Sequence, residues 1–168
     1  MDSNPRLIHK NTKVLETETG SLYIEEQNPT SVAVVAIRGE HLVLVRQFRH
    51  QLKGETIELP GGGLEDDEDP EMGAKRELLE ETGIKADTMT YIGSFHPQPY
   101  FTNRFSHLFF TTDTASTGDQ CLDEDEDISV MMMPVKEVLD SIRAGHYKDG
   151  ELGYALFLCI VRGLIKPT

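Results

Sequence analysis

Basic residues are scarce in this chain of 168 residues. Lys and Arg number 16 against 29 Asp and Glu, so the formal net charge at neutral pH is -13. Nucleic acids and anionic membranes both bind basic protein surfaces. The acidic balance therefore argues against both as partners, and a negatively charged ligand would need cations to mediate its binding.

Cysteine and long apolar runs are also scarce. Cys121 and Cys159 are the only cysteines and are far apart in the sequence, which argues against a disulfide framework and a zinc site and favours reduced thiols. Residues 1–20 contain no apolar signal core. The longest apolar stretch, residues 154–165, is short for a membrane span and contains Arg162. We therefore expect a cytoplasmic protein in which this stretch is a core helix.

The composition is that of a globular protein without repeats or low-complexity tracts. Apolar residues make up 38% and charged residues 27% of the chain. A chain of this length can bury a sizeable core without disulfides or structural metal ions. We expect one domain, with at most a short appended piece.

Runs of apolar and β-branched residues predict a sheet with several strands. Strands are expected at residues 12–18, 21–26, 32–37, 42–48, 56–59, 89–95, 105–111 and 128–133, and helices at 135–144 and 153–165. The sequence Pro-Gly-Gly-Gly at residues 60–63 is expected to continue neither a strand nor a helix. Strands mixed with helices in this way predict an α/β or α+β sandwich.

A further helix is marked at both of its ends. Asp69 is suited to the N-cap, Pro70 to the first helical position and Gly83 to the C-cap. The spacing predicts a helix of about three to four turns between them.

Three glutamates lie together near the end of this helix. Residues three and four apart share a helix face, so Glu77, Glu80 and Glu81 present their carboxylates on adjoining parts of one surface. Such carboxylates repel one another unless cations lie among them, and hard divalent ions prefer oxygen ligands. A solvated glutamate-rich face, with Arg76 and Glu80 as a surface ion pair, is the alternative interpretation.

The segment from residue 62 to 84 reads G-G-L-E-D-D-E-D-P-E-M-G-A-K-R-E-L-L-E-E-T-G-I and resembles the Nudix box, G-x5-E-x7-R-E-U-x-E-E-x-G-U with U aliphatic. The matching positions are Gly62, Glu68, Arg76, Glu77, Leu78, Glu80, Glu81, Gly83 and Ile84. The resemblance implies a Nudix hydrolase with an α/β/α sandwich and a mixed sheet, dependent on Mg²⁺ or Mn²⁺. It also implies that Glu77, Glu81 and the main chain of Gly61 bind metal, and that Arg76 and Glu80 belong to the catalytic machinery.

Two segments outside the box are similar to segments of ADP-ribose pyrophosphatases. Residues 45–49 read V-R-Q-F-R where that subfamily has V-R-Q-Y-R, and residues 57–62 read I-E-L-P-G-G where it has E-L-P-A-G. The subfamily carries an N-terminal β extension that forms a domain-swapped dimer. The resemblance therefore implies that residues 1–30 are a dimerisation extension and residues 31–168 the Nudix domain of a homodimer.

The substrate implied by this resemblance is ADP-ribose or a related nucleoside-diphosphate sugar. The subfamily's S-P-G is replaced by Q-P-Y at residues 98–100. This departure leaves GDP-mannose and other nucleoside-diphosphate sugars open beside ADP-ribose.

An acidic run at residues 123–127 precedes the strand expected at 128–133. Such a run is usually a solvated loop. It resembles the acidic loop of ADP-ribose pyrophosphatases that supplies the general base. The resemblance implies Glu124 as the base, and Glu126 as a further metal ligand or the alternative base.

Arginines near these segments are the candidate substrate-binding residues. Guanidinium groups bind phosphate through paired hydrogen bonds, so Arg46, Arg49 and Arg104 are expected to hold the diphosphate or the sugar, with Glu58 beside them. Two other functions remain open, namely hydrolysis of oxidised nucleoside triphosphates and binding of a nucleotide-sugar by a non-catalytic sensor. The first disagrees with the N-terminal extension and the second with the intact glutamate cluster.

Overall fold

A computed structural model of the chain describes residues 5–122 and 127–166. The strands are β1 (Pro5–His9), β2 (Thr12–Glu16), β3 (Leu22–Glu26), β4 (Thr30–Arg38), β5 (His41–Arg49), β6 (Gly54–Glu58), β7 (Gly61–Gly63), β8 (Ile84–Lys85), β9 (Thr90–Phe95), β10 (Phe105–Thr111), β11 (Ser116–Thr117) and β12 (Ile128–Pro134). The helices are α1 (Pro70–Thr82), α2 (Val135–Arg143) and α3 (Gly150–Val161).

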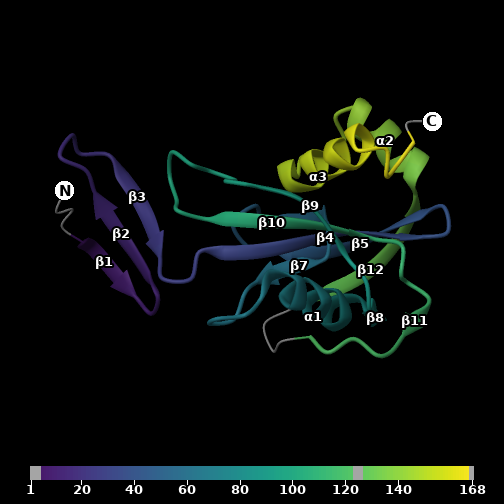
Figure 1. The fold of residues 1–168 in the computed structure, drawn as a ribbon. Coiled ribbons are helices and arrows are strands. Elements are labelled where there is room, and N and C mark those ends of the chain that lie inside the picture. The colour runs from purple at the N-terminus through teal and green to yellow at the C-terminus, as the bar shows by residue number, and fades with distance from the viewer. Residues whose placement is uncertain (1–4, 123–126, 167–168) are drawn as a thin grey trace.

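The main sheet is mixed and has helices on both of its faces. Its strands follow the order β12-β5-β4-β10-β9, with β6 beside β5 and β7 beside β4. The pairing of β4 with β10 is parallel, and the other pairings are antiparallel. Helix α1 lies on one face, and α2 and α3 lie on the other (Figure 1). The expected α/β/α sandwich with a mixed sheet is confirmed.

Strand β4 shows why both faces are covered. Side chains alternate between the faces of a strand. Val32 and Val34 belong to the core beneath α1, whereas Ala33 and Val35 belong to the core beneath α2 and α3. All four are at most 2% exposed. An uninterrupted apolar run is typical of a strand buried on both faces.

Strands β4 and β5 separate soon after the turn that joins them. They pair directly only near that turn, where Ile37 lies opposite Leu42. Farther along, β6 pairs with β5, and β7 pairs with β4. The link from β6 to β7 therefore crosses the space between the two separated strands, where Pro60 accepts a hydrogen bond of 2.9 Å from the Val34 N–H.

Helix α1 begins and ends at the residues expected from the sequence. The Asp69 carboxylate accepts hydrogen bonds from the N–H groups of Glu71 and Met72, at 3.0 and 3.2 Å. Gly83 has a φ of 70°, and its N–H donates to the Leu79 carbonyl. These bonds satisfy main-chain groups that a helix leaves unpaired at its two ends.

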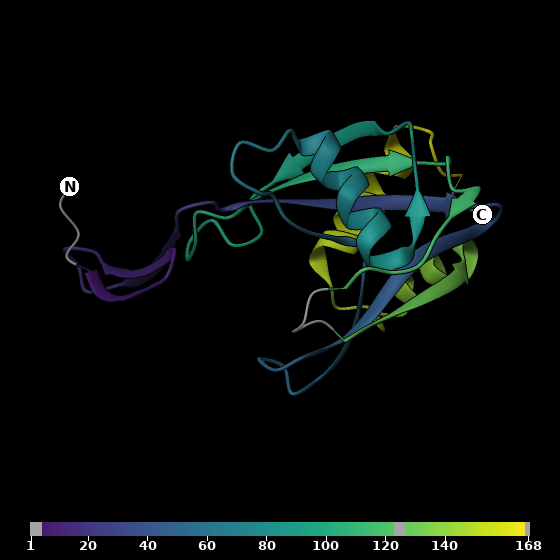
Figure 2. The same cartoon turned by 90° about the horizontal axis from the view of Figure 1, so that it is seen from below.

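The N-terminal strands form a separate sheet in the order β1-β2-β3 that extends away from the main body (Figures 1 and 2). It is joined to the body at the end of β3, where the Asn103 side chain bonds both the N–H and the carbonyl of Glu26 at 2.9 Å. The Ile24 N–H donates to the Phe101 carbonyl at 2.7 Å. The expected small N-terminal β piece is therefore present, with β1 as a strand that the sequence patterns did not indicate.

Two details of the sequence-based prediction are wrong. Residues 61–63 form strand β7, because glycine lets this segment lie directly against β4: a Cβ atom on Gly61 would come within 2.1 Å of the Val32 carbonyl oxygen. The last helix is Gly150–Val161 rather than 153–165, because Asp149 caps it through a bond of 2.7 Å from the Leu152 N–H.

The described part of the chain has no helix with the length and apolar character needed to cross a membrane. Cys121 is exposed and Cys159 is buried, and both are free thiols.

Candidate active site

Two of the three clustered glutamates face inward from α1. Glu77 is 8% exposed and Glu81 is 3% exposed, and they share the buried side of the helix with Ala74 and Leu78. The Gly61 N–H of β7 donates to the Glu81 carboxylate at 2.7 Å. Burying a carboxylate is costly unless it is hydrogen-bonded or paired, so these two side chains lie where a cation would be stabilised.

The second glycine of β7 leaves room for Glu77. A Cβ atom on Gly62 would lie 2.6 Å from the nearest carboxylate oxygen of Glu77. At Gly63, by contrast, a Cβ atom would meet nothing within 4 Å. The absence of a side chain at Gly62 therefore lets the Glu77 carboxylate lie directly against the main chain of β7.

Arg76 joins the polar groups around this helix. Its guanidinium donates to both oxygens of Glu68 at 2.8 and 2.9 Å, to Glu77 at 2.8 Å and to Glu80 at 2.9 Å. It also donates to the Gly63 carbonyl at 3.0 Å. The hydrogen bond to Glu68 raises the pKa of Arg76 above its already high ordinary value. The hydrogen bonds to Glu77 and Glu80 raise it further. Arg76 thus fixes α1 against the loop that precedes it.

Arg49 and Glu58 form a paired group at the ends of β5 and β6. The Arg49 Nε donates to Glu58 at 2.9 Å, and an Nη2 hydrogen bond completes the paired contact. Burial opposes ionisation of Glu58, but hydrogen bonds from Arg49, Thr56 and Gln47 outweigh it and lower the pKa of Glu58. The Glu58 bond raises the Arg49 pKa, with smaller contributions from the charges of Glu81 and Asp149.

A polar cavity of about 250 Å³ opens beside these groups, and we call it the β4–β7 cavity. Its lining residues are Glu26, Asn28, Pro29, Thr30, Ser31, Val32, Ala33, Arg49, Glu58, Leu59, Gly61, Gly62, Gly63, Arg104 and Glu151. Segments from both ends of the chain and from the Nudix-box-like loop therefore meet at one hollow.

The expected substrate-binding residues do not all reach this cavity. Arg49, Glu58 and Arg104 line it, and Arg104 is ion-paired with Glu26 at 2.8 Å. Arg46 is not among the lining residues; it is ion-paired with Glu55 at 4.0 Å.

The two glutamates expected from the acidic loop, Glu124 and Glu126, lie outside the described residues.

A divalent cation fits this site by the chemistry of its donors. Glu77, Glu81 and the Gly61 carbonyl are hard oxygen donors of the kind that Mg²⁺ and Mn²⁺ accept. Among residues 5–122 and 127–166, no three His, Cys, Asp or Glu side chains form a metal-binding group by themselves. The remaining oxygens would therefore have to come from the main chain, from water, from Glu126 or from substrate phosphates.

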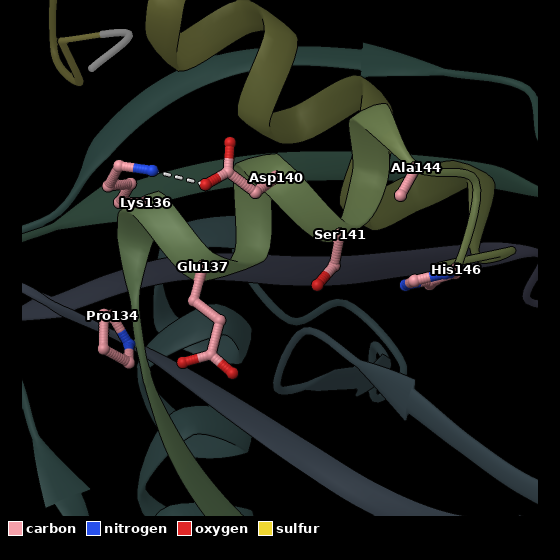
Figure 3. A pocket seen from close by; sticks show the side chains of 7 residues that line it. All are labelled: Pro134, Lys136, Glu137, Asp140, Ser141, Ala144 and His146. Atoms are coloured by element: carbon pink, nitrogen blue, oxygen red, sulfur yellow. Dashed lines mark hydrogen bonds and ion pairs between the residues drawn. The ribbon is translucent and has the colours of Figure 1, made fainter.

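A larger hollow, of about 380 Å³, lies on α2 (Figure 3). Its lining residues are Pro134, Lys136, Glu137, Asp140, Ser141, Ala144 and His146. Lys136 is ion-paired with Asp140 at 2.5 Å. This hollow lies on the opposite face of the sheet from α1, which carries Glu77 and Glu81 (Figure 1). We therefore do not take it as the candidate active site, although it is larger.

Sequence reasoning missed Glu151, in the first turn of α3. The hydroxyl of buried Ser106 in β10 donates to its carboxylate. Burial raises the pKa of Glu151, and the charge of Asp149 raises it a little more. The hydrogen bond from Ser106 lowers it by less than burial raises it. A lone acidic residue in the first turn of a helix is common, and so nothing in the sequence marked this one.

Comparisons with known proteins agree with these features. The NUDIX domain family matches residues 27–151. The chain is 35% identical over 132 residues to an ADP-ribose pyrophosphatase of Bacillus subtilis (strain 168), covering 77% of this chain and 71% of that protein. It is 35% identical over 127 residues to a methanol dehydrogenase activator of Bacillus methanolicus, covering 74% and 69%. It is 31% identical over 146 residues to a GDP-mannose pyrophosphatase of Cronobacter sakazakii (strain ATCC BAA-894), covering 82% and 76%.

The fold is also similar to that of a solved protein. The crystal structure of an ADP compounds hydrolase superposes with a TM-score of 0.80 at 22% identity, and covers 99% of this chain and 92% of that one.

Proposed function

This chain belongs to the Nudix family as a Nudix hydrolase, and on that premise we propose that it cleaves the diphosphate of a nucleoside-diphosphate sugar. The products are a nucleoside monophosphate and a phosphorylated sugar. The observation that carries the proposal is the burial of Glu77 and Glu81 against the glycines of β7, next to a cavity that contains Arg49.

The proposed metal ligands are Glu77, Glu81, Glu126 and the Gly61 carbonyl, with Mg²⁺ or Mn²⁺ as the ion. A divalent cation held by these residues would lower the pKa of the attacking water and would neutralise charge on the phosphate oxygens. Gly61 contributes its N–H as well, because this group holds the Glu81 carboxylate in place at 2.7 Å.

The side chains around this centre orient the substrate and move the proton. The water oxygen forms a bond to one phosphorus while the bond from that phosphorus to the bridging oxygen breaks. Glu124 accepts the proton of the attacking water, with Glu126 as the alternative base.

Arginine side chains bind the substrate in this proposal. Arg49, held by Glu58 at 2.9 Å, and Arg104 bind the diphosphate and the adjacent ribose. Arg46, farther along β5 and outside the lining of the cavity, is the third proposed contact.

Arg76 and Glu80 act by positioning. The Arg76 guanidinium bonds Glu77 and Glu80 at 2.8 and 2.9 Å, and thereby fixes the carboxylate-bearing turn of α1 relative to β7. Arg76 transfers no proton in this proposal, because its raised pKa keeps the guanidinium protonated.

Similarity supports two substrates. One relative is named for ADP-ribose and another for GDP-mannose, at 35% and 31% identity. Both compounds are sugars linked to a nucleoside diphosphate, which is the class that we propose for this chain.

Product analysis tests the function directly. Purified protein with Mg²⁺ or Mn²⁺ is given ADP-ribose, GDP-mannose and an oxidised dGTP, with EDTA as the control. We expect monophosphate and sugar phosphate from at least one of the two sugars, and none with EDTA. Cleavage of the triphosphate alone would favour a housecleaning hydrolase, and binding without cleavage of any compound would favour a sensor.

We further propose that residues 1–30 dimerise the chain and that residues 31–168 form the Nudix domain. The separate β1-β2-β3 sheet supports this division. The charge of -13 supports the absence of nucleic-acid and membrane partners, and a cytoplasmic location remains a prediction from the sequence.

A further inference from the structure

Glu151 lines the β4–β7 cavity from the opposite side of the sheet to Glu77 and Glu81. It belongs to α3, whereas Glu77 and Glu81 belong to α1 on the other face (Figure 1). Ser106, which is 0% exposed, donates its hydroxyl hydrogen bond to Oε1 of Glu151. This bond fixes the orientation of the carboxyl group at the cavity wall.

One oxygen of Glu151 is left available to a ligand. Within residues 5–122 and 127–166, the hydrogen bond to this carboxylate comes from Ser106 and reaches Oε1, which leaves Oε2 to solvent or a ligand. Glu58 differs in this respect, because Arg49 and Gln47 occupy its Oε2, and Arg49 and Thr56 occupy its Oε1. Glu58 therefore serves to hold Arg49, whereas Glu151 can bind something else.

The electrostatic surroundings show which part of a substrate Glu151 suits. Burial, with the nearby charges of Asp149 and Glu58, raises its pKa, and the Ser106 bond acts in the opposite direction. An ionised carboxylate repels phosphate, so Glu151 does not suit the diphosphate. A carboxyl group in either protonation state hydrogen-bonds hydroxyl groups well.

The size and composition of the cavity point the same way. Pockets for drug-sized ligands usually hold about 300–1,000 Å³, and this one holds about 250 Å³. No aromatic ring is among the described residues that line it, although nucleobases are commonly stacked on aromatic side chains. The cavity thus fits a small polyhydroxylated group better than a nucleobase.

We propose that Glu151 is a specificity-determining residue that binds hydroxyl groups of the substrate's second sugar, the one released as a sugar phosphate. This inference rests on the proposed function. Arg49 connects the two halves of the site, because it is close enough to both Glu81 of α1 and Asp149 before α3 for their charges to act on it. The diphosphate would lie on the α1 side of Arg49 and the sugar on the α3 side.

The experiment compares two substrates in three variants. The assay compares the wild type with Glu151→Ala, Glu151→Gln and the control Glu137→Ala. The substrates are ADP-ribose and the β-methyl ester of ADP, whose methyl group carries no hydroxyl. Glu137 occupies the corresponding first turn of α2 and lies in the other hollow. We expect Glu151→Ala to raise KM for ADP-ribose about tenfold, the size expected from loss of a charged hydrogen bond. Its kcat, and its KM for the methyl ester, should stay within about twofold of the wild-type values.

The conservative variant and a binding measurement separate recognition from folding. Glu151→Gln keeps an acceptor for the sugar and should lose less than Glu151→Ala. Calorimetric titration without metal should show that ribose 5-phosphate or mannose 1-phosphate binds the wild type and Glu137→Ala, and binds Glu151→Ala about tenfold more weakly. Inorganic phosphate should bind all three proteins equally.

An equal rise in KM for both substrates would assign Glu151 a structural role and overturn the inference. So would failure of both sugar phosphates to bind the wild type. Absence of hydrolysis by the wild type would defeat the proposed function instead, and the titrations would then still decide whether Glu151 recognises the sugar.

Discussion

At the scale of single residues, the same side-chain type serves different purposes according to burial and partners. Glu81 is 3% exposed and is held by a main-chain N–H. Glu58 holds an arginine through both of its oxygens. Glu80 lies at the edge of the buried helix face, where 37% of its side chain is exposed, and is ion-paired with Arg76. The exposed fraction, which the sequence does not give, thus separates Glu77 and Glu81 from Glu80.

Substitution of Glu81 tests the proposed metal site. Glu81→Gln keeps the volume and an acceptor for the Gly61 N–H but removes the charge, so we expect kcat to fall by about 100-fold or more while the melting temperature changes little. Steady-state kinetics and thermal unfolding measure the two effects. The control is Glu71→Gln on the same helix, whose side chain is 47% exposed. Normal turnover in Glu81→Gln would remove Glu81 from the site.

The pair of Arg49 and Glu58 predicts a pH dependence of stability. The folded-state pKa of Glu58 is lowered from its ordinary value of 4.5. The unfolded chain therefore takes up the proton first, so the stabilisation by Glu58 is complete above about pH 5 and is lost as the pH falls through the folded-state pKa. Glu58→Gln should reduce the free energy of unfolding by about 1–2 kcal/mol at neutral pH.

Urea unfolding of the wild type and Glu58→Gln at several pH values measures this difference. We expect the two curves of stability against pH to approach each other toward acid pH. Glu55→Gln, with a side chain 64% exposed on the same strand, is the control and should follow the wild type. A difference between wild type and Glu58→Gln that stays constant over the acid range would contradict the linkage.

At the scale of elements, the short strand β7 is as important as α1. It exists because β4 and β5 separate, so β4 has a free edge to which residues 61–63 can pair. Its glycines let α1 approach closely enough for Glu77 to touch the main chain. The strand and the helix thus form the candidate site together.

Neighbouring glycines of β7 provide a matched pair of variants. In Gly62→Ala the new Cβ would lie 2.6 Å from the Glu77 carboxylate, which must move away. Because that carboxylate ends a flexible side chain, we expect the melting temperature to change by only about 2 °C and kcat/KM to fall by about 10–100-fold. Gly63→Ala, whose Cβ meets nothing within 4 Å, should lose less activity than Gly62→Ala, because it leaves the Glu77 carboxylate in place. Equal activities of the two variants would show that the position of Glu77 does not matter.

At the scale of the whole molecule, the N-terminal sheet carries exposed apolar side chains. The strand registers place Leu7, Val14, Leu22 and Ile24 on one face of it. Leu7 is 61% exposed and Leu22 is 52% exposed. A small sheet needs packing against an apolar surface to be stable, and a second copy of the chain would supply one.

The proposed dimer is tested by its mass in solution. Light scattering after gel filtration should give twice the chain mass of 18.9 kDa for the wild type. Leu7→Glu places a charge on the apolar face and should shift the mass toward one chain, whereas Thr19→Glu, at an exposed turn, should not. A single-chain mass for the wild type would remove the dimerisation role of residues 1–30 and leave the catalytic proposal intact.

The sequence by itself determined the features that depend on neighbours in the chain. The ends of α1 could be predicted because Asp69, Pro70 and Gly83 act on main-chain groups within four residues of them. The buried strands could be predicted from their apolar runs, and the family from fixed spacings in one segment.

Only the tertiary structure decided which distant residues meet. The cavity brings together Glu26, Arg49, Arg104 and Glu151, which are far apart in sequence. Their meeting depends on the separation of β4 from β5 and on the packing of α3 across the sheet, which are long-range contacts without a local sequence signal. For the same reason, Arg46 and Arg49 were both expected to bind the substrate, but of these two only Arg49 lines the cavity.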